Sequence, residues 1–471
     1  MSLVAISFLA FLAAFLLVGI ASAFHRSESA EDYLVADRSI SPWLTALSAV
    51  ATNNSGFMFI GLIGVTYAVG ISSAWIMIGW MAGDYAAWLT VHRRFRIRSG
   101  ALLSNSVPGF LGSLRKGQVS RAIVIVSAII VIVFLGVYAA AQLKAGSKAL
   151  HVLFGWDYHW GATIGIVIIV AYCMSGGIRA SIWTDAAQSI VMLGSMTLLL
   201  VIAFARTGGP GGLYDELFAI DPKLVALTPE NLRFGLLAYV VSWIFAGLGV
   251  TGQPHIMVRA MAIRSAEAVR SARRIYFSWY LLFTAGCIGV GLACRVLLAS
   301  DQAFDPELAL PQLTHELLPD ILVGLTLAGL FAATMSTADS QVLSCSAAIT
   351  SDLLPSWSKS YLRTKLGTLI VAAIVYVIAL FGDDSVFDLV VDAWAMLGSS
   401  LGPLLIVQSL QRLPSARVGL LMILAGFATV VGWWQLPASI QNSLYAVMPG
   451  MLAGFGVWLL GVAFDSRAKP A

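Results

Sequence analysis

Charge is what this sequence most lacks. Asp, Glu, Lys and Arg together make up only 11% of its 471 residues, whereas hydrophobic residues make up 59%. A mean hydropathy of +0.87 is too high for a water-soluble globular domain of this length. Apolar stretches of membrane-spanning length recur along the whole chain, so they predict an all-α integral membrane protein that lies in a lipid bilayer. The short alternating strands of a barrel do not fit such stretches.

Further absences narrow the class of function. The four cysteines show no metal-ligand spacing such as C-x-x-C and are expected to be packing residues. No phosphate-binding G-x-x-x-x-G-K-[ST] motif occurs, so an ion gradient rather than ATP is the expected energy source. Asp84 lacks the G-x-G-D context of an intramembrane aspartyl protease, and no segment is polar enough for a soluble output domain. We therefore expect a secondary transporter, not an enzyme or a sensor, and no nucleic-acid partner.

The apolar runs predict thirteen membrane spans. They are placed at residues 3-23, 42-70, 71-91, 121-150, 158-177, 181-205, 232-255, 274-298, 318-350, 364-382, 386-411, 417-435 and 443-464. The first run lacks a basic leading region and a clear cleavage site, so it is interpreted as a retained helix and not as a signal peptide. An odd number of crossings places the two termini on opposite sides of the membrane.

The basic residues predict the orientation of the chain. With the N-terminus outside, most of the 28 Lys and Arg residues fall in predicted cytoplasmic segments, including the run from Arg93 to Arg98 and Arg259 after the seventh span. Cytoplasmic loops retain such an excess of basic residues. The expected location is the bacterial inner membrane, with the C-terminus in the cytoplasm.

Two of the predicted spans carry features that interrupt a helix. In the second span, four polar residues and a glycine follow one another from Thr52 to Gly56, and in the seventh span Gly247 to Pro254 contains three glycines and a proline. Glycine and proline weaken helices, and polar side chains at mid-membrane suit a ligand better than lipid. Interrupted helices at matching positions of two five-helix halves are typical of LeuT-like transporters with inverted repeats and a site at the bilayer midplane.

This layout predicts the domain organisation. We expect an extra helix and inner loop at 1-41, a first five-helix repeat at 42-205, an outer loop at 206-231, a second repeat at 232-412, and two C-terminal helices at 413-471.

The ninth span combines hydroxyl side chains with an acid. Ser336, Thr337 and Ser340 lie beside Asp339. A carboxylate inside a membrane costs about 3 kcal/mol unless it is paired or binds a cation. Hydroxyls, together with carbonyls freed by an interrupted helix, are suitable ligands for a hard monovalent cation.

Several ordered stretches now support a family resemblance. They are residues 46-49, 181-188, 252-256, 259-265 and 335-341. With these stretches the chain resembles the sodium:solute symporter family, and its length and predicted layout resemble the proline branch of that family. The resemblance implies Na+ as the coupling ion and a small organic solute as cargo, imported by alternating access.

The resemblance also implies two groups of sodium ligands. The central site would use the backbone carbonyls of Ala51, Asn54 and Ala333 and the hydroxyls of Ser336 and Thr337. Some family members have a second sodium site, and the matching positions here are Asp185, Ser336, Asp339 and Ser340. At this point the second site stays open, because pairing of both acids with protein groups would leave one sodium.

The expected solute contacts come from both interrupted helices and the fourth span. They are Asn53, Ser55, Tyr138, Gln142, Ala246, Val250 and Gln253. The proline symporter has an aspartate at the position of Asn53 and large aromatic residues at Ala246 and Val250, so this pocket is expected to be wider. Proline or another small amino acid is the expected solute, and the residues at Ala246 and Val250 predict that proline is not the best of them. The alternatives are a sugar or carboxylate carried with sodium, and proton coupling.

Two further charged residues lie within predicted spans. Lys144 is two residues past Gln142 on a different helix face, and it is expected to extend to the outer interface. Asp84 lies close to the inner basic run, where an ion pair with an arginine is the preferred interpretation. The oligomeric state is not predicted.

Overall fold

The protein is an all-helical bundle in its computed structural model, which describes residues 2–25, 27–114, 118–298, 305–381 and 385–467. Within these ranges, ten helices are long and apolar enough to cross a membrane. Each of the thirteen predicted spans coincides with a helical segment, but the number thirteen itself stays a prediction. The chain is therefore a multi-pass membrane protein.

The helices follow one another with short connections. Their bounds are α1 (Leu3–Ser22), α2 (Ala30–Val35), α3 (Pro42–Asn53), α4 (Ile63–Val69), α5 (Ala74–Thr90), α6 (His92–Ala101), α7 (Val107–Gly112), α8 (Arg121–Phe154), α9 (Tyr158–Arg206), α10 (Gly209–Ile220), α11 (Gly235–Leu248), α12 (Pro254–Ala262), α13 (Ala268–Leu297), α14 (Ala309–Leu317), α15 (Asp320–Ala347), α16 (Tyr361–Phe381), α17 (Val386–Ser409), α18 (Ala416–Trp433), α19 (Ala438–Gln441) and α20 (Val447–Arg467).

The first predicted interruption is confirmed. Helix α3 ends at Asn53, and Asn54 has non-helical dihedral angles (φ −93°, ψ 66°) before a π-helical segment, Phe57–Leu62, continues into α4. The side chains explain the break: Asn54 Nδ2 donates to the Val50 carbonyl at 2.9 Å, and Ser55 Oγ accepts from Phe57 N at 3.2 Å. Such local bonds replace the regular helical ones.

The second predicted interruption is also confirmed. Helix α11 ends at Leu248, a 3₁₀ turn covers Gly249–Gly252, and Gln253 is extended (φ −98°, ψ 96°). Pro254 then begins α12, the position at which its missing N–H is harmless. A Cβ at Gly252 would meet the Gly398 Cα at 2.8 Å, so glycine allows α17 to approach this break closely.

The predicted spans 158-177 and 181-205 are two helices that meet at a sharp kink, and both carry the label α9. Gly177 lies at the bend in a conformation (φ 55°, ψ −136°) that other residues rarely adopt. Next to it, Arg179 donates from Nε to Asp32 Oδ1 at 3.1 Å and holds α2 against α9. Burial raises the pKa of Asp32 above its usual value, although the Arg179 guanidinium opposes that rise.

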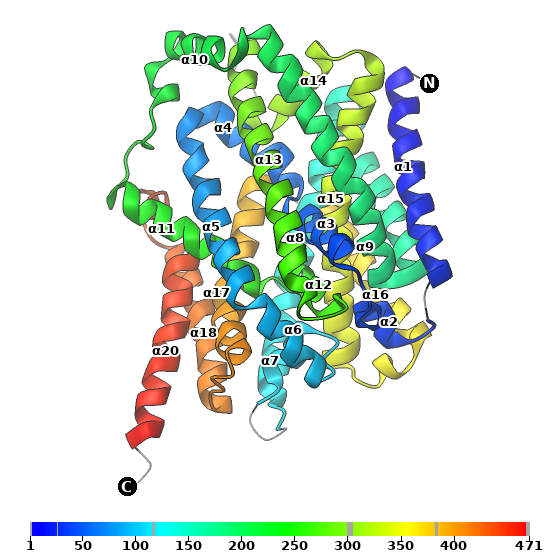
Figure 1. The fold of residues 1–471 in the computed structure, drawn as a ribbon, viewed down its shortest axis with the longest axis vertical. Coiled ribbons are helices and arrows are strands. Elements are labelled where there is room, and N and C mark those ends of the chain that lie inside the picture. The colour runs from blue at the N-terminus through cyan, green and yellow to red at the C-terminus, as the bar shows by residue number, and fades with distance from the viewer. Residues whose placement is uncertain (1, 26, 115–117, 299–304, 382–384, 468–471) are drawn as a thin grey trace.

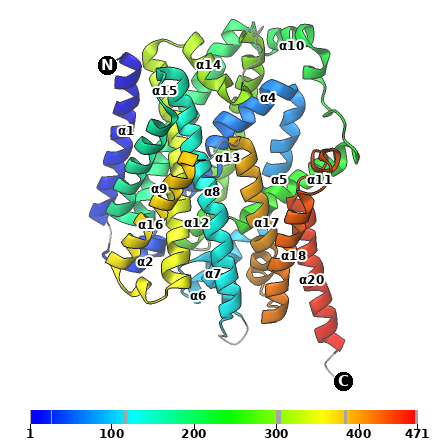
Figure 2. The ribbon, with the colours of Figure 1, turned by 180° about the vertical axis from the view of Figure 1, so that it is seen from behind.

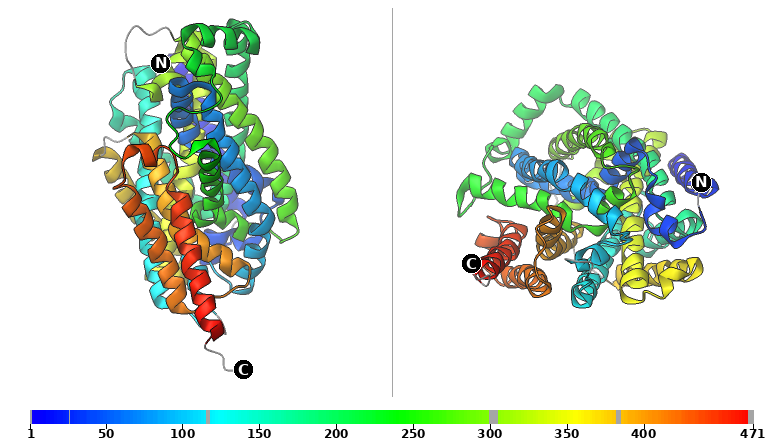
Figure 3. Two further views of the ribbon diagram at one scale, coloured as in Figure 1. Left: turned by 90° about the vertical axis from the view of Figure 1, so that its left-hand side faces the viewer. Right: turned by 60° about the horizontal axis from the view of Figure 1, so that its bottom comes forward.

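The helices surround the two interruptions. Helix α3 packs on α9, α13 and α15, and the 3₁₀ turn 249–252 packs on α17. Helix α1 lies on the outside of α9 and α15, whereas α18 and α20 pack together on the opposite side of the bundle (Figure 3). Both interruptions therefore lie inside the bundle.

The two ends of the bundle differ. Helices α10 and α14 lie at the end where α1 begins, and α2, α6 and α7 lie at the end where α20 finishes (Figures 1 and 2). We call these the α10 end and the α6 end. The described termini thus lie at opposite ends, and the basic run from Arg93 to Arg98 lies in α6.

Candidate functional site

The predicted sodium ligands of α3 and α15 come together at the first break. Ser336 Oγ lies 3.2 Å from the Ala51 carbonyl oxygen and 3.1 Å from that of Ala333. Thr337 Oγ1 lies 3.1 Å from the same Ala333 oxygen and 2.9 Å from the Thr52 carbonyl oxygen. All of these residues are buried. Two hydroxyls and carbonyls from an interrupted helix form an oxygen set suitable for a sodium ion once the hydroxyl hydrogens turn aside.

The break supplies the carbonyls of this set. Because α3 ends at Asn53, the carbonyls of its last turn have no continuing helix to accept from, and Ala51 and Thr52 accept from α15 instead. Asn54 lies at the end of α3, and its carbonyl stays a predicted ligand.

Thr52 was not predicted as a site residue. Besides its carbonyl contact, Thr52 Oγ1 lies 3.2 Å from the Ser336 carbonyl oxygen and 3.4 Å from Asp185 Oδ2. It therefore connects the hydroxyl cluster with the acids of α9 and α15. The sequence feature that could have identified Thr52 is its place in the polar run, between Ala51 and Asn54.

The acids expected at a second sodium site are also brought together. Asp185 Oδ2 accepts from Ser48 Oγ at 2.6 Å, and Asp339 Oδ1 accepts from Ser181 Oγ at 3.1 Å and from Ser340 Oγ at 2.7 Å. Both carboxylates are completely buried.

Arg259 of α12 extends into this acid cluster. Its Nη2 lies 2.9 Å from Asp185 Oδ2 and 3.0 Å from Ser181 Oγ, and it also bonds Ser340 Oγ. Only 1% of Arg259 is exposed, so its expected place in a cytoplasmic loop is wrong. The physical reason is that α12 begins directly at the second break, inside the bundle, and carries the guanidinium to the acids. A protein cation thus pairs with Asp185.

Tyr138 and Gln142 of α8 contact the first break. The hydroxyls of Ser55 and Tyr138 lie 3.3 Å apart, and Gln142 Oε1 accepts from Gly56 N at 2.8 Å. A backbone N–H can only donate, so this contact fixes which end of the amide is the oxygen. Gln142 Nε2 is then left as a donor with no protein acceptor within the described ranges.

Gln253 has the complementary arrangement at the second break. Its Nε2 donates to the Trp394 carbonyl at 3.1 Å, which fixes Oε1 as the free end. Among the described residues nothing donates to Gln253 Oε1. Gln142 at the first break therefore presents a buried donor, and Gln253 at the second presents a buried acceptor.

Ala246 and Val250 are buried at the second break, and an aromatic residue of α17 lies beside them. Trp394 Nε1 donates to the Ala246 carbonyl at 2.9 Å, and its ring lies 4.8 Å from that of Trp80. Sequence comparison at positions 246 and 250 could not reveal this tryptophan, because it comes from a helix about 150 residues away. A wider pocket stays a prediction.

Asn53 and Asp84 are joined through Tyr276 of α13. Asn53 Nδ2 donates to the tyrosine oxygen at 2.6 Å, and the tyrosine hydroxyl donates to Asp84 Oδ2 at 2.7 Å. The expected ion pair between Asp84 and an arginine is wrong within the described ranges. Asp84 lies in the membrane-buried part of α5, whereas the basic run lies in the following helix, α6.

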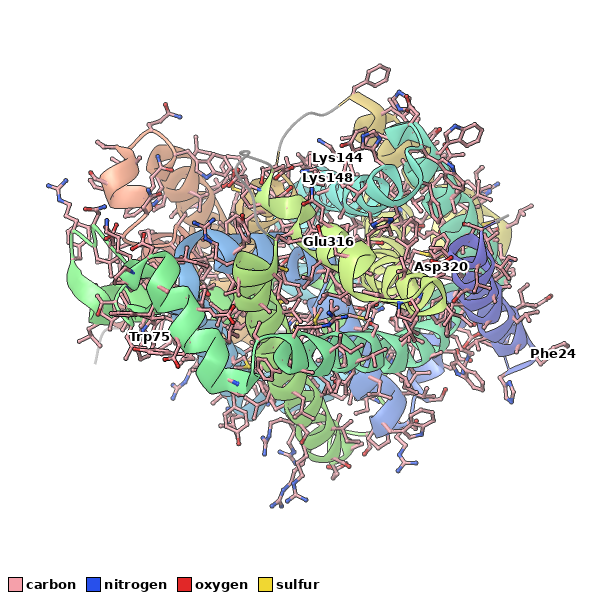
Figure 4. The ribbon with its side chains drawn as sticks, turned by 90° about the horizontal axis from the view of Figure 1, so that it is seen from above. Phe24, Trp75, Lys144, Lys148, Glu316 and Asp320 are labelled. Atoms are coloured by element: carbon pink, nitrogen blue, oxygen red, sulfur yellow. The ribbon has the colours of Figure 1, made fainter. Side chains whose placement is uncertain are left out.

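The lysines of α8 lie toward the α10 end. Lys148 pairs with Asp305 at 2.9 Å and with Glu307, and Figure 4 shows Lys144 next to Lys148 in the view onto this end. That position agrees with the interfacial one expected for Lys144. The contacts of Lys148 are thus with acids at this end and not with the expected site residues.

The family model of the sodium:solute symporter family matches residues 33–411. The chain is 33% identical over 454 residues to the high-affinity proline transporter PutP of Bacillus subtilis, covering 94% of each protein. It is 30% identical over 468 residues to the sodium/proline symporter of Escherichia coli, covering 95% of this chain and 90% of that protein.

Solved structures share the fold. A sodium-coupled sialic acid symporter, solved substrate-bound and outward-open, superimposes with a TM-score of 0.84 at 18% identity, covering 100% of this chain and 98% of that one. Mhp1, a nucleobase-cation-symport-1 family transporter in a closed conformation, gives a TM-score of 0.59 at 14% identity, covering 92% and 95% of the two chains.

Proposed function

The chain belongs to the sodium:solute symporter family, and we propose that it carries proline or a closely similar small amino acid into the cell together with sodium. It is a secondary active transporter with the LeuT-like fold that the interrupted helices predicted. The observation that carries the proposal is the pair of breaks. They place an oxygen cluster beside buried amides whose outer ends have no partner among the described residues.

The proposed sodium site uses the carbonyls of Ala51, Asn54 and Ala333 and the hydroxyls of Ser336 and Thr337. These groups belong to α15 and to the first break, so a bound sodium ion would join the two. Joining them stabilises one conformation of the break. The solute contacts on that break are then ordered, which gives positive coupling between ion and solute.

We propose one sodium ion per transport cycle. Arg259 already supplies a positive charge to Asp185 and bonds Ser181 and Ser340, which also contact Asp339. A second cation at this place would have to displace a buried, hydrogen-bonded guanidinium, which is costly.

The amide groups favour a zwitterionic solute. Gln142 Nε2 is a donor suitable for a carboxylate, while Gln253 Oε1 and Asn53 Oδ1 are acceptors suitable for an ammonium group. The relatives with about a third of their residues identical transport proline, which carries both groups. Tyr138 and Ser55 line the same break, and Trp394 supplies an aromatic surface.

In the proposed membrane orientation, the N-terminus faces the outside and the α6 end faces the cytoplasm of a bacterial cell. The basic helix α6 then lies on the inner side. Alternating access would proceed by rearrangement at the two breaks.

A competition assay tests the choice of solute. Uptake of labelled proline by cells that express the protein is measured against a panel of amino acids, sugars and carboxylates. Proline is expected to compete most strongly, and Gln142→Glu is expected to weaken its competition about tenfold or more, because a donor to the carboxylate is lost. Gln441→Glu, outside the site, is the matched control. A sugar or a dicarboxylate that competes better than every amino acid would overturn the proposal.

A further inference from the structure

Asp84 is a buried carboxylate that the proposed transport cycle does not yet use. It lies in α5 with no solvent exposure, and none of the ion pairs within the described ranges includes it. Oδ2 accepts from the Tyr276 hydroxyl, and Oδ1 has no hydrogen-bond partner among the described residues. An acid inside a membrane protein calls for a functional explanation, because burial of its charge is costly.

In the chain of hydrogen bonds from Asn53 through Tyr276 to Asp84, each donor points toward Asp84. A tyrosine hydroxyl has a single hydrogen, and Tyr276 gives it to the Asp84 carboxyl group at 2.7 Å. The tyrosine oxygen must therefore accept from Asn53, which it does at 2.6 Å. As a result, Nδ2 of Asn53 is used, and Oδ1 is the free end.

This chain of bonds lies between the two breaks. Asn53 is the last residue of α3, and Asp84 follows Gly83, where α5 packs directly on α11. A Cβ on Gly247 would lie 2.6 Å from the Asp84 amide nitrogen, so the backbone of residue 84 is in close contact with the region that leads into the second break. Asp84 is thus placed to influence the proposed solute contacts at the first break through Tyr276 and Asn53.

We propose that Asp84 is a positioning and specificity residue, which acts through Tyr276 to present Asn53 Oδ1 as an acceptor for the ammonium group of the solute. The inference rests on the proposed function and deepens it. A residue without a hydrogen-bond acceptor at position 84 lets Tyr276 donate to Asn53 Oδ1 instead. The acceptor is then lost, and with it the preference for an amine.

Compounds that lack the ammonium group test the proposal. The probes are L-proline, its ring-oxygen analogue tetrahydrofuran-2-carboxylate, and cyclopentanecarboxylate, each used against labelled proline uptake. In the wild type, both analogues are expected to compete at least about tenfold more weakly than proline, because the site's acceptors are left unpaired. In Asp84→Leu, which removes the acceptor at similar size, the KM for proline is expected to rise about tenfold with little change in maximal rate. The difference in competition between proline and its two analogues is expected to narrow to about twofold.

A second line of evidence comes from Tyr276→Phe and from the double variant that combines it with Asp84→Leu. If the residues act as one chain, Tyr276→Phe reproduces the narrowed gap, and the double variant loses no more than either single variant. Asp392→Asn, an acid of α17 that bonds Trp434 instead of the site, is the matched control and is expected to keep the wild-type gap. Tyr276→Phe also tests the proposal if Asp84→Leu does not fold.

The outcomes separate the inference from the proposed function. An unchanged difference between proline and its analogues in active Asp84→Leu or Tyr276→Phe protein overturns the inference alone. A change confined to the sodium concentration for half-maximal uptake does so too. Equal weakening of all three probes with a lower unfolding temperature would assign Asp84 a purely structural role. Absence of sodium-dependent proline uptake by the wild type would overturn the proposed function and the inference together.

Discussion

At the scale of single residues, the hydroxyls of α15 have the most specific environment. Ser336 and Thr337 are consecutive, yet both bond Ala333 one turn earlier, and each also bonds a carbonyl of α3. A hydroxyl that only satisfies its own helix would not need the second contact. These cross-helix contacts distinguish the proposed ion site from ordinary packing.

Thr337→Ala removes one proposed sodium ligand. We expect the sodium concentration for half-maximal uptake to rise about fivefold or more, the effect of losing about 1 kcal/mol of binding. Sodium titration of proline uptake measures it. Thr326→Ala is the control, because Thr326 is a buried hydroxyl of the same helix that bonds only the Leu322 carbonyl. Equal sodium dependence in the two variants would remove Thr337 from the site.

Sequence reasoning at the residue scale succeeded where the signal was local. The polar run around Asn53 and the hydroxyls beside Asp339 are easily recognised in a hydrophobic chain. It failed where a partner comes from a distant helix: Arg259 pairs with Asp185, 74 residues away, and Tyr276 contacts Asp84, 192 residues away. Such pairings depend on helix packing, which one sequence without its structure does not specify.

At the scale of elements, helix α5 and helix α11 depend on two small residues for their close contact. Gly83 lies against the Ile244 backbone, and Gly247 lies against the Trp80 carbonyl. Small residues allow membrane helices to approach this closely. The contact places both Asp84 and the end of α11, and therefore supports the second break.

Gly83→Ala tests this contact. An added methyl group is expected to destabilise the protein by about 1–3 kcal/mol, because it meets backbone atoms that cannot move aside easily. Thermal unfolding of purified protein in detergent measures the change. Gly136→Ala in α8 is the control: a Cβ there meets nothing within 4 Å, and alanine favours helix by about 1 kcal/mol. If Gly83→Ala unfolds no earlier than Gly136→Ala, the glycine contact is not needed.

Most elements could be predicted, because their signals are hydrophobic length and helix breakers. Both interruptions lie where polar residues, glycines and Pro254 indicated. The boundary between the predicted spans 158-177 and 181-205 lies at a kink at Gly177, whose positive φ ends the regular helix there. Helix α10 lies within the predicted loop 206-231.

At the scale of the whole molecule, the proposed ion and solute sites lie together inside the bundle. The proposed ratio of one sodium per solute sets the driving force. A membrane potential of about 100 mV contributes about 2.3 kcal/mol for one charge, and a tenfold sodium gradient adds about 1.4 kcal/mol. This supports a solute gradient of about 500-fold, enough to collect a scarce nutrient.

Accumulation of labelled proline by proteoliposomes that contain the purified protein tests the central claim most directly. With an inward sodium gradient, proline is expected to accumulate inside above its external concentration, because sodium entry drives solute entry. With choline in place of sodium, only equilibration or less is expected, whether or not a proton gradient is present. Equal accumulation with choline and a proton gradient would contradict the account.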